Sequence, residues 1–260
     1  MKTLVSRYDK KMIGQLPKIL FPGRIIVIQS QTEASKAVEY LLSQQVVGID
    51  TETKPVFKKG SGMNPVALLQ VSTEDTCFLF RLNHIGLTNE LVKLMSDDKV
   101  LKVGLSLKDD FAQLKRRKPF DVGRFAELQE MVKEMGIIDQ SLQKLYANFF
   151  GQRISKSMQL SNWEADILTE AQKLYAATDA WACIQLYKEI LHLNECGYML
   201  EIVPETEQPI VHEPTPTEIA AKKEKKKQKQ KEKRKRRSLK AKEQRRRSND
   251  RKDKEKLKSL

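Results

Sequence analysis

Residues 156–163 read KSMQLSNW, and residues 172–180 read QKLYAATDA. The second run lies in a stretch with helical periodicity, in which Tyr175 and Asp179 are four residues apart. A phenol and a carboxylate at this spacing share one helix face and lie about one turn apart. Tyr and Asp also form ordinary surface pairs on helices, so the spacing alone does not identify a site.

A pair of acidic residues stands at the end of an earlier predicted strand, residues 46–51 (VVGIDT). Asp50 and Glu52 are two residues apart, so both side chains can project from one face of the strand and share a metal ion. Hydrolysis of a phosphodiester requires neutralisation of the charge that builds on its oxygens, and two divalent cations about 4 Å apart provide this. Solvated carboxylates are common at strand ends, so the pair by itself is weak evidence.

The runs at 156–163 and 172–180 closely resemble the third exonuclease motif of the ribonuclease D and Werner-syndrome exonuclease family. Residues 47–53 resemble the first motif and residues 103–114 the second, so the motifs occur in the family's order. The resemblance covers about residues 21–198. It implies a ribonuclease H-like α/β fold, with a mixed sheet flanked by helices, and a metal-dependent 3′-5′ exonuclease that releases nucleoside 5′-monophosphates.

The resemblance also implies roles for individual residues in a site that holds two Mg²⁺ or Mn²⁺ ions. Asp50 corresponds to the acid that bridges both metals, while Glu52 and Asp179 help to hold the first. Asp110 serves the second metal through water. Tyr175 resembles the tyrosine that orients the attacking water in the tyrosine branch of these DEDD exonucleases.

The second-motif acid is ambiguous because Asp109 and Asp110 are adjacent. Neighbouring residues point about 100° apart on a helix, so only one of them is expected to face the site. Asp110 is preferred because Leu114 follows it by four residues, as in the DFxxL-like spacing of relatives, whereas Asp109 has Gln113 there. Asp109 remains the alternative.

Three further residues near the motifs are candidates for substrate binding. Thr51 and Gln70 are placed to contact the terminal nucleotide, and Lys156 to reach backbone phosphates. Packing within strands explains the first two equally well, and ordinary surface charge explains the third. Trp163 could stack on a base, although a core position is preferred. The choice between DNA and RNA stays open because no motif reads the 2′-hydroxyl.

Periodicity predicts a mixed α/β chain. The expected strands are residues 24–29, 46–51, 66–72, 76–82 and 100–104. The expected helices are residues 32–42, 90–95, 107–114 and 124–134, together with a long helix that begins at the capping-box pattern of Thr169–Gln172 and ends near Gly197.

The net charge of +14 is concentrated at one end of the chain. Residues 222–260 contain 22 Lys and Arg against 6 Asp and Glu, which leaves a net charge of −2 for residues 1–221. Such a segment can neutralise the phosphate backbone without reading its sequence, although an inert tail or a localisation signal is the alternative. The expected organisation is an N-terminal extension (1–20), an exonuclease domain (21–203), a Pro-containing linker (204–221) and a disordered Lys/Arg-rich tail (222–260).

Several other classes of protein are not indicated. Cys77, Cys183 and Cys196 are widely spaced in apolar sequence, which favours reduced core thiols over disulfides or a zinc site. No apolar run reaches the roughly 20 residues that span a bilayer, so no membrane segment is expected. The expected location is the cytoplasm in a bacterium, or the nucleus or nucleolus in a eukaryote.

Two other functions compete with an exonuclease. One is a catalytically silent protein that keeps the fold and binds nucleic acid, and the other is an adaptor that docks on RNA through its basic tail. The presence of all four acids and Tyr175 favours an active exonuclease on single-stranded 3′ ends of DNA or RNA.

Overall fold

The computed structural model describes residues 1–57 and 62–204. Residues 1–203 form one compact unit. The predicted basic tail, 222–260, and almost all of the predicted linker lie outside the described residues. Within the described ranges, no helix is both long enough and apolar enough to cross a membrane.

A six-stranded mixed sheet forms the centre of the unit, with the strand order β2-β5-β4-β3-β6-β7. The middle strands β3, β4 and β5 pair antiparallel, whereas β2 pairs parallel with β5, and β6 pairs parallel with both β3 and β7. The strands are β2 (Arg24–Ile28), β3 (Val46–Thr53), β4 (Val66–Ser72), β5 (Thr76–Phe80), β6 (Leu101–Gly104) and β7 (Phe125–Glu127).

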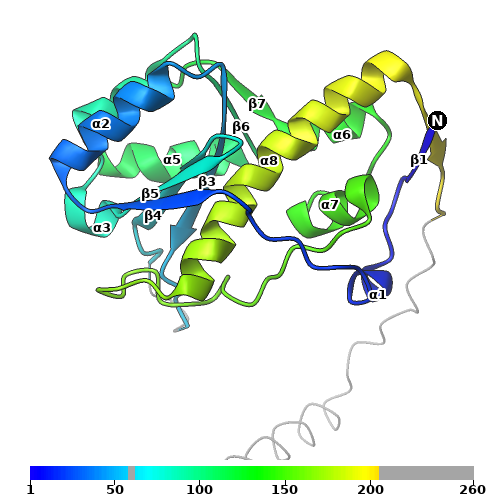
Figure 1. Ribbon diagram of the computed structural model, residues 1–260, viewed down its shortest axis with the longest axis horizontal. Coiled ribbons are helices and arrows are strands. Elements are labelled where there is room, and N and C mark those ends of the chain that lie inside the picture. The colour runs from blue at the N-terminus through cyan, green and yellow to red at the C-terminus, as the bar shows by residue number, and fades with distance from the viewer. Residues whose placement is uncertain (58–61, 205–260) are drawn as a thin grey trace, which may run out of the picture. The chain divides into compact units, whose positions relative to one another are not determined.

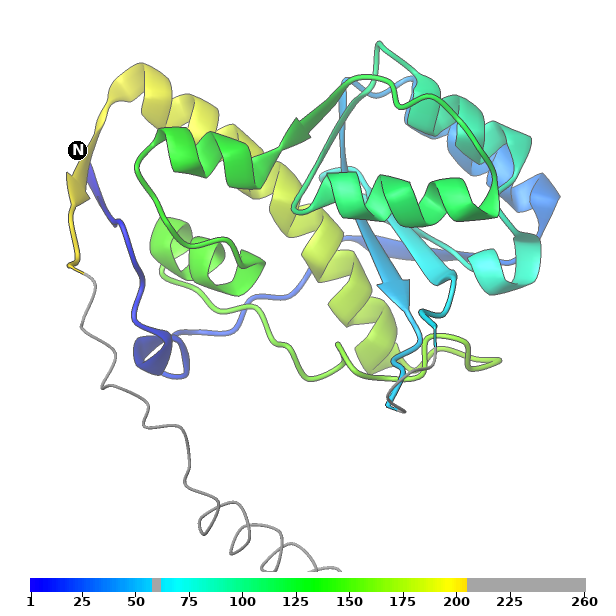
Figure 2. The same ribbon diagram turned by 180° about the vertical axis from the view of Figure 1, so that it is seen from behind.

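Helices cover both faces of the sheet, as Figures 1 and 2 show from opposite sides. One apolar core lies between the sheet and the helices α6, α7 and α8, and a second lies between the sheet and α2, α4 and α5. The helices are α1 (Lys10–Ile13), α2 (Gln31–Leu42), α3 (Leu82–Ile85), α4 (Asn89–Ser96), α5 (Leu107–Arg117), α6 (Leu128–Glu134), α7 (Leu142–Phe150) and α8 (Glu170–Cys196). The predicted mixed α/β fold with flanking helices is confirmed.

A second, two-stranded sheet joins the two ends of the compact unit. Strand β1 (Lys2–Val5) pairs parallel with β8 (Tyr198–Glu201), which follows α8 directly. The side chain of Asn148 in α7 bonds both the amide and the carbonyl of Val5, which fixes β1 beside α7. The first 20 residues therefore pack within the same unit as the large sheet.

The long helix α8 begins with the predicted capping box. The Thr169 hydroxyl accepts a hydrogen bond from the Gln172 amide, and the Gln172 side chain accepts one from the Thr169 amide. The helix ends at Gly197, whose φ of +81° suits a residue without a side chain. Trp163 is fully buried, which confirms its predicted core position.

Three sequence-based expectations need correction. The sequence predicts one helix over residues 124–134, but Phe125–Glu127 forms a strand that pairs with β6. The helix begins at Leu128, and Glu127 caps it by accepting a hydrogen bond from the Gln129 amide. Helix α7 is not among the helices that the sequence predicts. Cys196 is exposed rather than a core thiol, whereas Cys77 and Cys183 are buried.

Candidate functional site

Two acidic side chains of the site come from β3. Asp50 and Glu52 project from the face of the sheet that α8 covers, because alternate residues of a strand share a face. The same face carries Gly48, where an added Cβ would lie 2.0 Å from the carbonyl oxygen of Ala180 in α8. The missing side chain at Gly48 therefore allows α8 to approach β3 closely at this point.

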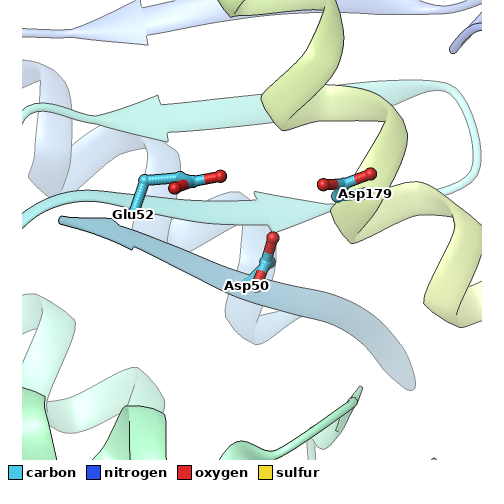
Figure 3. Close-up of side chains that lie close together, drawn as sticks. All are labelled: Asp50, Glu52 and Asp179. Atoms are coloured by element: carbon cyan, nitrogen blue, oxygen red, sulfur yellow. The ribbon is translucent and has the colours of Figure 1, made fainter. Parts of the chain in front are cut away.

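Helix α8 supplies the third acid. Asp179 precedes Ala180, so the close approach at Gly48 brings its carboxylate toward the two carboxylates of β3. One oxygen from each of the acids Asp50, Glu52 and Asp179 lies within 4.8 Å of the others. Figure 3 shows the three side chains pointing toward a common space, two from the strand and one from the helix.

A fourth acid approaches from α5. Asp110 accepts a hydrogen bond of 2.5 Å from the Thr51 hydroxyl, whereas the neighbouring Asp109 is exposed. The charge of Asp50 contributes to raising the pKa of Asp110, which places the two carboxylates in one electrostatic cluster. The structure thus turns Asp110, not Asp109, toward the other acids.

The acids of this cluster have pKa values raised well above the ordinary carboxyl range. Burial is the largest cause for every one of them. Neighbouring carboxylates raise the pKa of Asp50 and Glu52 further, because each negative charge disfavours the next. At Asp179 the phenol of Tyr175 and the charge of Lys156 act in the opposite direction and lower the pKa.

The donor set fits a divalent cation. Carboxylate oxygens are the ligands that Mg²⁺ and Mn²⁺ prefer, and the three closest acids present theirs to one space. One oxygen of Asp179 is buried and has no hydrogen-bond partner within the described part of the chain. A buried acceptor without a donor is costly, and a bound cation would satisfy it.

Tyr175 lies one turn before Asp179 and lines the same cavity of about 280 Å³. Its ring packs 6.0 Å from that of the buried Trp163, between ring centroids, which holds the phenol in place. Burial, followed by the charges of Asp179 and Glu52, raises the pKa of the Tyr175 phenol far above its usual value. The phenol is therefore protonated at neutral pH and can orient water by hydrogen bonding.

The three predicted substrate-binding residues lie in different surroundings. Lys156 is exposed and lines the cavity. Thr51 also lines it, with its hydroxyl on Asp110. Gln70 is paired with Asp50 across β3 and β4 but is fully buried, and its side chain is not among those that line the cavity.

Glu127 supports the site through the start of α5, a role that the sequence pattern does not indicate. Its two carboxylate oxygens accept hydrogen bonds from the backbone amides of Ser106 (2.9 Å) and Leu107 (2.7 Å), which begin α5. Ser106 has a φ of +59°, and the bond to Glu127 stabilises this left-handed turn. Glu127 thus fixes the start of the helix that carries Asp110. No local pattern marks it, because it reaches Ser106 only through the pairing of β6 with β7.

Six neutral polar residues form a further part of the cavity wall, and they too were not predicted. They come from α6, from α7 and the loop before it, and from the loop before α8, and they are Gln129, Gln140, Ser141, Gln143, Ser155 and Gln159. Amides and hydroxyls of this kind can donate to and accept from phosphate and sugar oxygens. They carry no spacing signal that would have identified them in the sequence.

Comparison with known proteins places this geometry among nucleases. A family model described as 3′-5′ exonuclease matches residues 25–194. The mouse bifunctional 3′-5′ exonuclease/ATP-dependent helicase WRN is 32% identical over 199 residues, which are 72% of this chain and 14% of that protein. A 3′-5′ exonuclease of Arabidopsis thaliana is 28% identical over 194 residues, 69% of this chain and 67% of that protein.

The fold has solved counterparts as well. The structure of Escherichia coli RNase D, an exoribonuclease involved in structured RNA processing, superimposes with a TM-score of 0.60 at 18% sequence identity. The match covers 66% of this chain and 46% of the RNase D chain. At this identity the likeness concerns the fold.

Proposed function

The chain belongs to the 3′-5′ exonuclease family, and from this premise we propose that it hydrolyses single-stranded DNA or RNA from the 3′ end and releases nucleoside 5′-monophosphates. The observation that carries the proposal is the convergence of Asp50, Glu52 and Asp179 beside Tyr175, within the segment that the family model matches. The buried acids and the amide-lined wall suit an anionic, sugar-containing substrate.

We propose that Asp50, Glu52, Asp179 and Asp110 hold two Mg²⁺ or Mn²⁺ ions. When bound, such ions neutralise the negative charge that develops on the phosphoryl oxygens and make water a better nucleophile. The acids supply the counter-charge that the ions require. The positive charge of a bound ion would offset the mutual repulsion and the lost hydration that raise the pKa values of these carboxyls.

The side chains around the acids orient the reactants. The protonated Tyr175 phenol hydrogen bonds the attacking water, whose oxygen forms a new bond to the terminal phosphorus while the bond from phosphorus to the 3′ oxygen of the preceding nucleotide breaks. The proton of the water passes to solvent, and the leaving 3′ oxygen takes up a proton. Lys156, at the rim of the cavity, pairs with a backbone phosphate.

The test uses single-stranded DNA and RNA of matched sequence, labelled at the 3′ or the 5′ end. Each is incubated with the full chain in Mg²⁺, Mn²⁺ or EDTA, beside an Asp50→Ala, Glu52→Ala double variant. We expect 5′-labelled products to shorten stepwise with metal, the 3′ label to leave as a mononucleotide, and the double variant to be inactive. The faster sugar identifies the substrate. No metal-dependent shortening of either substrate would refute the proposal.

We propose further that residues 222–260 tether the substrate through its phosphates. Their 22 basic side chains should release counterions on binding, with a log-log salt slope of about −0.7 for each single-strand phosphate contacted. Replacing the basic residues of 222–237 with Gln should flatten the salt dependence of binding without changing the rate at saturating substrate. An unchanged slope would show that the segment is not a tether.

A further inference from the structure

The chain between α1 and β2 lies against the loop that precedes α8. We call residues 16–21 the N-terminal strap. The Arg153 amide donates to the carbonyl of Pro17 (2.9 Å), and the Ile19 amide donates to the carbonyl of Arg153 (3.1 Å), which together make a parallel bridge. The Arg153 side chain also donates to the carbonyl of Leu16. Backbone bonds therefore hold the strap beside residues that line the active-site cavity.

The other end of the strap is fixed to α8. The Phe21 amide donates to the Thr178 hydroxyl (3.0 Å), one residue before Asp179. The buried Phe21 ring packs 6.0 Å from that of Trp181, between centroids. Figure 1 shows this dark blue segment crossing α8 on its way from α1 to β2. The strap lies before the match to the family, which starts at residue 25.

A second cavity, of about 150 Å³, opens between the strap and α8. Ile154, Ser155 and Tyr175 line both this cavity and the cavity of about 280 Å³ that holds the acids, so the two cavities are neighbours that share part of their walls. The strap thus forms one wall of a cavity beside the acids, where the proposed function places the scissile phosphate.

The lining of the second cavity has the chemistry of a nucleotide site. Its aliphatic walls are Ile19 and Leu20 from the strap, with Ile154 and Leu174 opposite. Lys18, which is exposed, brings a positive charge to the lining. Apolar walls beside an aromatic ring suit the faces of a base, and a lysine suits the phosphate attached to it.

We propose that the N-terminal strap forms a second nucleotide subsite, in which the cavity takes the base of the nucleotide that precedes the scissile phosphate and Lys18 binds a backbone phosphate. The proposal rests on the exonuclease function proposed above. It makes the strap a determinant of substrate binding that lies outside the matched family segment.

The test compares a mononucleotide with a dinucleotide. Binding of dAMP and of 5′-phosphorylated diadenosine dinucleotides, with deoxyribose or ribose, is measured on the full chain in an Asp50→Asn background that removes cleavage. Lys18→Glu reverses the charge and Leu20→Trp fills the cavity. Lys11→Glu in α1 makes the same charge change at an exposed position away from the cavity. Thermal unfolding of each variant identifies those that fail to fold.

We expect Lys18→Glu and Leu20→Trp each to raise the dinucleotide Kd about tenfold and to leave the dAMP Kd unchanged. Lys18→Glu removes one charge-assisted contact, and Leu20→Trp occupies the space that the base would take. Lys11→Glu should change neither. Equal effects on both ligands, or no effect on the dinucleotide, would overturn the subsite. If Leu20→Trp unfolds, Lys18→Glu alone decides. Cleavage is measured separately on the chain that keeps Asp50. The selective loss in the Asp50→Asn background, with no cleavage by the chain that keeps Asp50, would support the subsite and overturn the exonuclease. Cleavage by that chain without the selective loss would do the reverse.

Discussion

Replacing Gly48 with alanine should separate the acids of the site without touching any of them. The added Cβ would lie 2.0 Å from the Ala180 carbonyl oxygen and 2.9 Å from its carbon, both backbone atoms of α8. Restoring an ordinary contact of 3.4 Å requires β3 and α8 to move apart locally by about 1.4 Å. Asp50 is two residues from Gly48 on β3, and Asp179 is next to Ala180 on α8. We therefore expect the two carboxylates to move apart when the backbones separate.

The expected cost of Gly48→Ala follows from this overlap. Overpacking of a core contact typically destabilises by about 1–3 kcal/mol, partly offset by about 0.4–1 kcal/mol from the stiffer unfolded chain. In a unit of this size, each kcal/mol lowers the Tm by about 2–4 °C. The effect on rate should be larger, because a displacement of about 1 Å at a reacting centre costs about 100-fold.

Gly14→Ala is the matched control, because its Cβ would meet nothing within 4 Å and its backbone is right-handed helical. Both variants are compared by thermal unfolding with and without Mg²⁺, and by the rate of 3′ shortening. We expect Gly48→Ala to lose most of the metal-induced rise in Tm and about 100-fold in rate, and Gly14→Ala to match the parent chain. A Gly48→Ala chain with the parent rate and metal response would show that this contact does not set the distance between the two acids.

Three further predictions concern the site itself. Asp110→Asn should lower the cleavage rate or the Mg²⁺ affinity by about 10- to 100-fold. Asp109→Asn changes an exposed residue, so its rate and Mg²⁺ affinity should stay within about twofold of the parent values. Equal effects of the two variants in a metal titration would contradict the placement of Asp110. Tyr175→Phe should lower the single-turnover rate by about 100-fold without shifting its pH profile, because the phenol is protonated throughout; a profile that shifts would mean that the phenol loses its proton in the working range. In EDTA, the free energy of unfolding should be greatest near pH 4 and fall toward pH 8. Burial raises the pKa of Asp50 from 3.8 to about 8 and that of Asp179 to about 7, so over this range the folded state keeps protons that the unfolded state releases. Each such proton lowers the free energy of unfolding by about 1.4 kcal/mol per pH unit. Saturating Mg²⁺ should flatten this fall in the Tm, and Asp50→Asn, which removes one of the four acids with raised pKa values, should make it less steep. An equally steep fall in all three samples would contradict this reasoning.

The elements that frame the site could be predicted because their signals are local. The apolar run at residues 46–51 predicts β3, and helical periodicity predicts α8. The capping-box residues at 169–172 predict where α8 begins. Helix α7 carries buried positions at Leu145, Tyr146 and Phe149, yet its short run of apolar residues does not favour helix over strand. The pairing of β1 with β8 joins segments almost 200 residues apart, which no local pattern reveals.

The composition of the site was only partly accessible from the sequence. Spacing put Asp50 and Glu52 on one strand face and Tyr175 and Asp179 on one helix face, but only the resemblance to a family joined the two pairs. The structure shows a physical reason for their meeting, which is the close contact at Gly48. The wall of amides and hydroxyls and the strap were not predicted, since neutral polar residues and irregular backbone acquire a role only through tertiary contacts.

The distribution of charge separates substrate capture from the chemical step. Residues 1–221 carry a net charge of −2, so they exert no net attraction on a polyanion. Among residues 1–57 and 62–204, Lys156 and Lys18 are the only basic groups that line the two cavities. Fields from exposed charges are screened beyond about 10 Å at 0.1 M salt, so these two act only on a strand that is already close. Long-range capture in the proposed function therefore depends on residues 222–260 and is sensitive to salt, whereas cleavage depends on divalent cations that the acids hold.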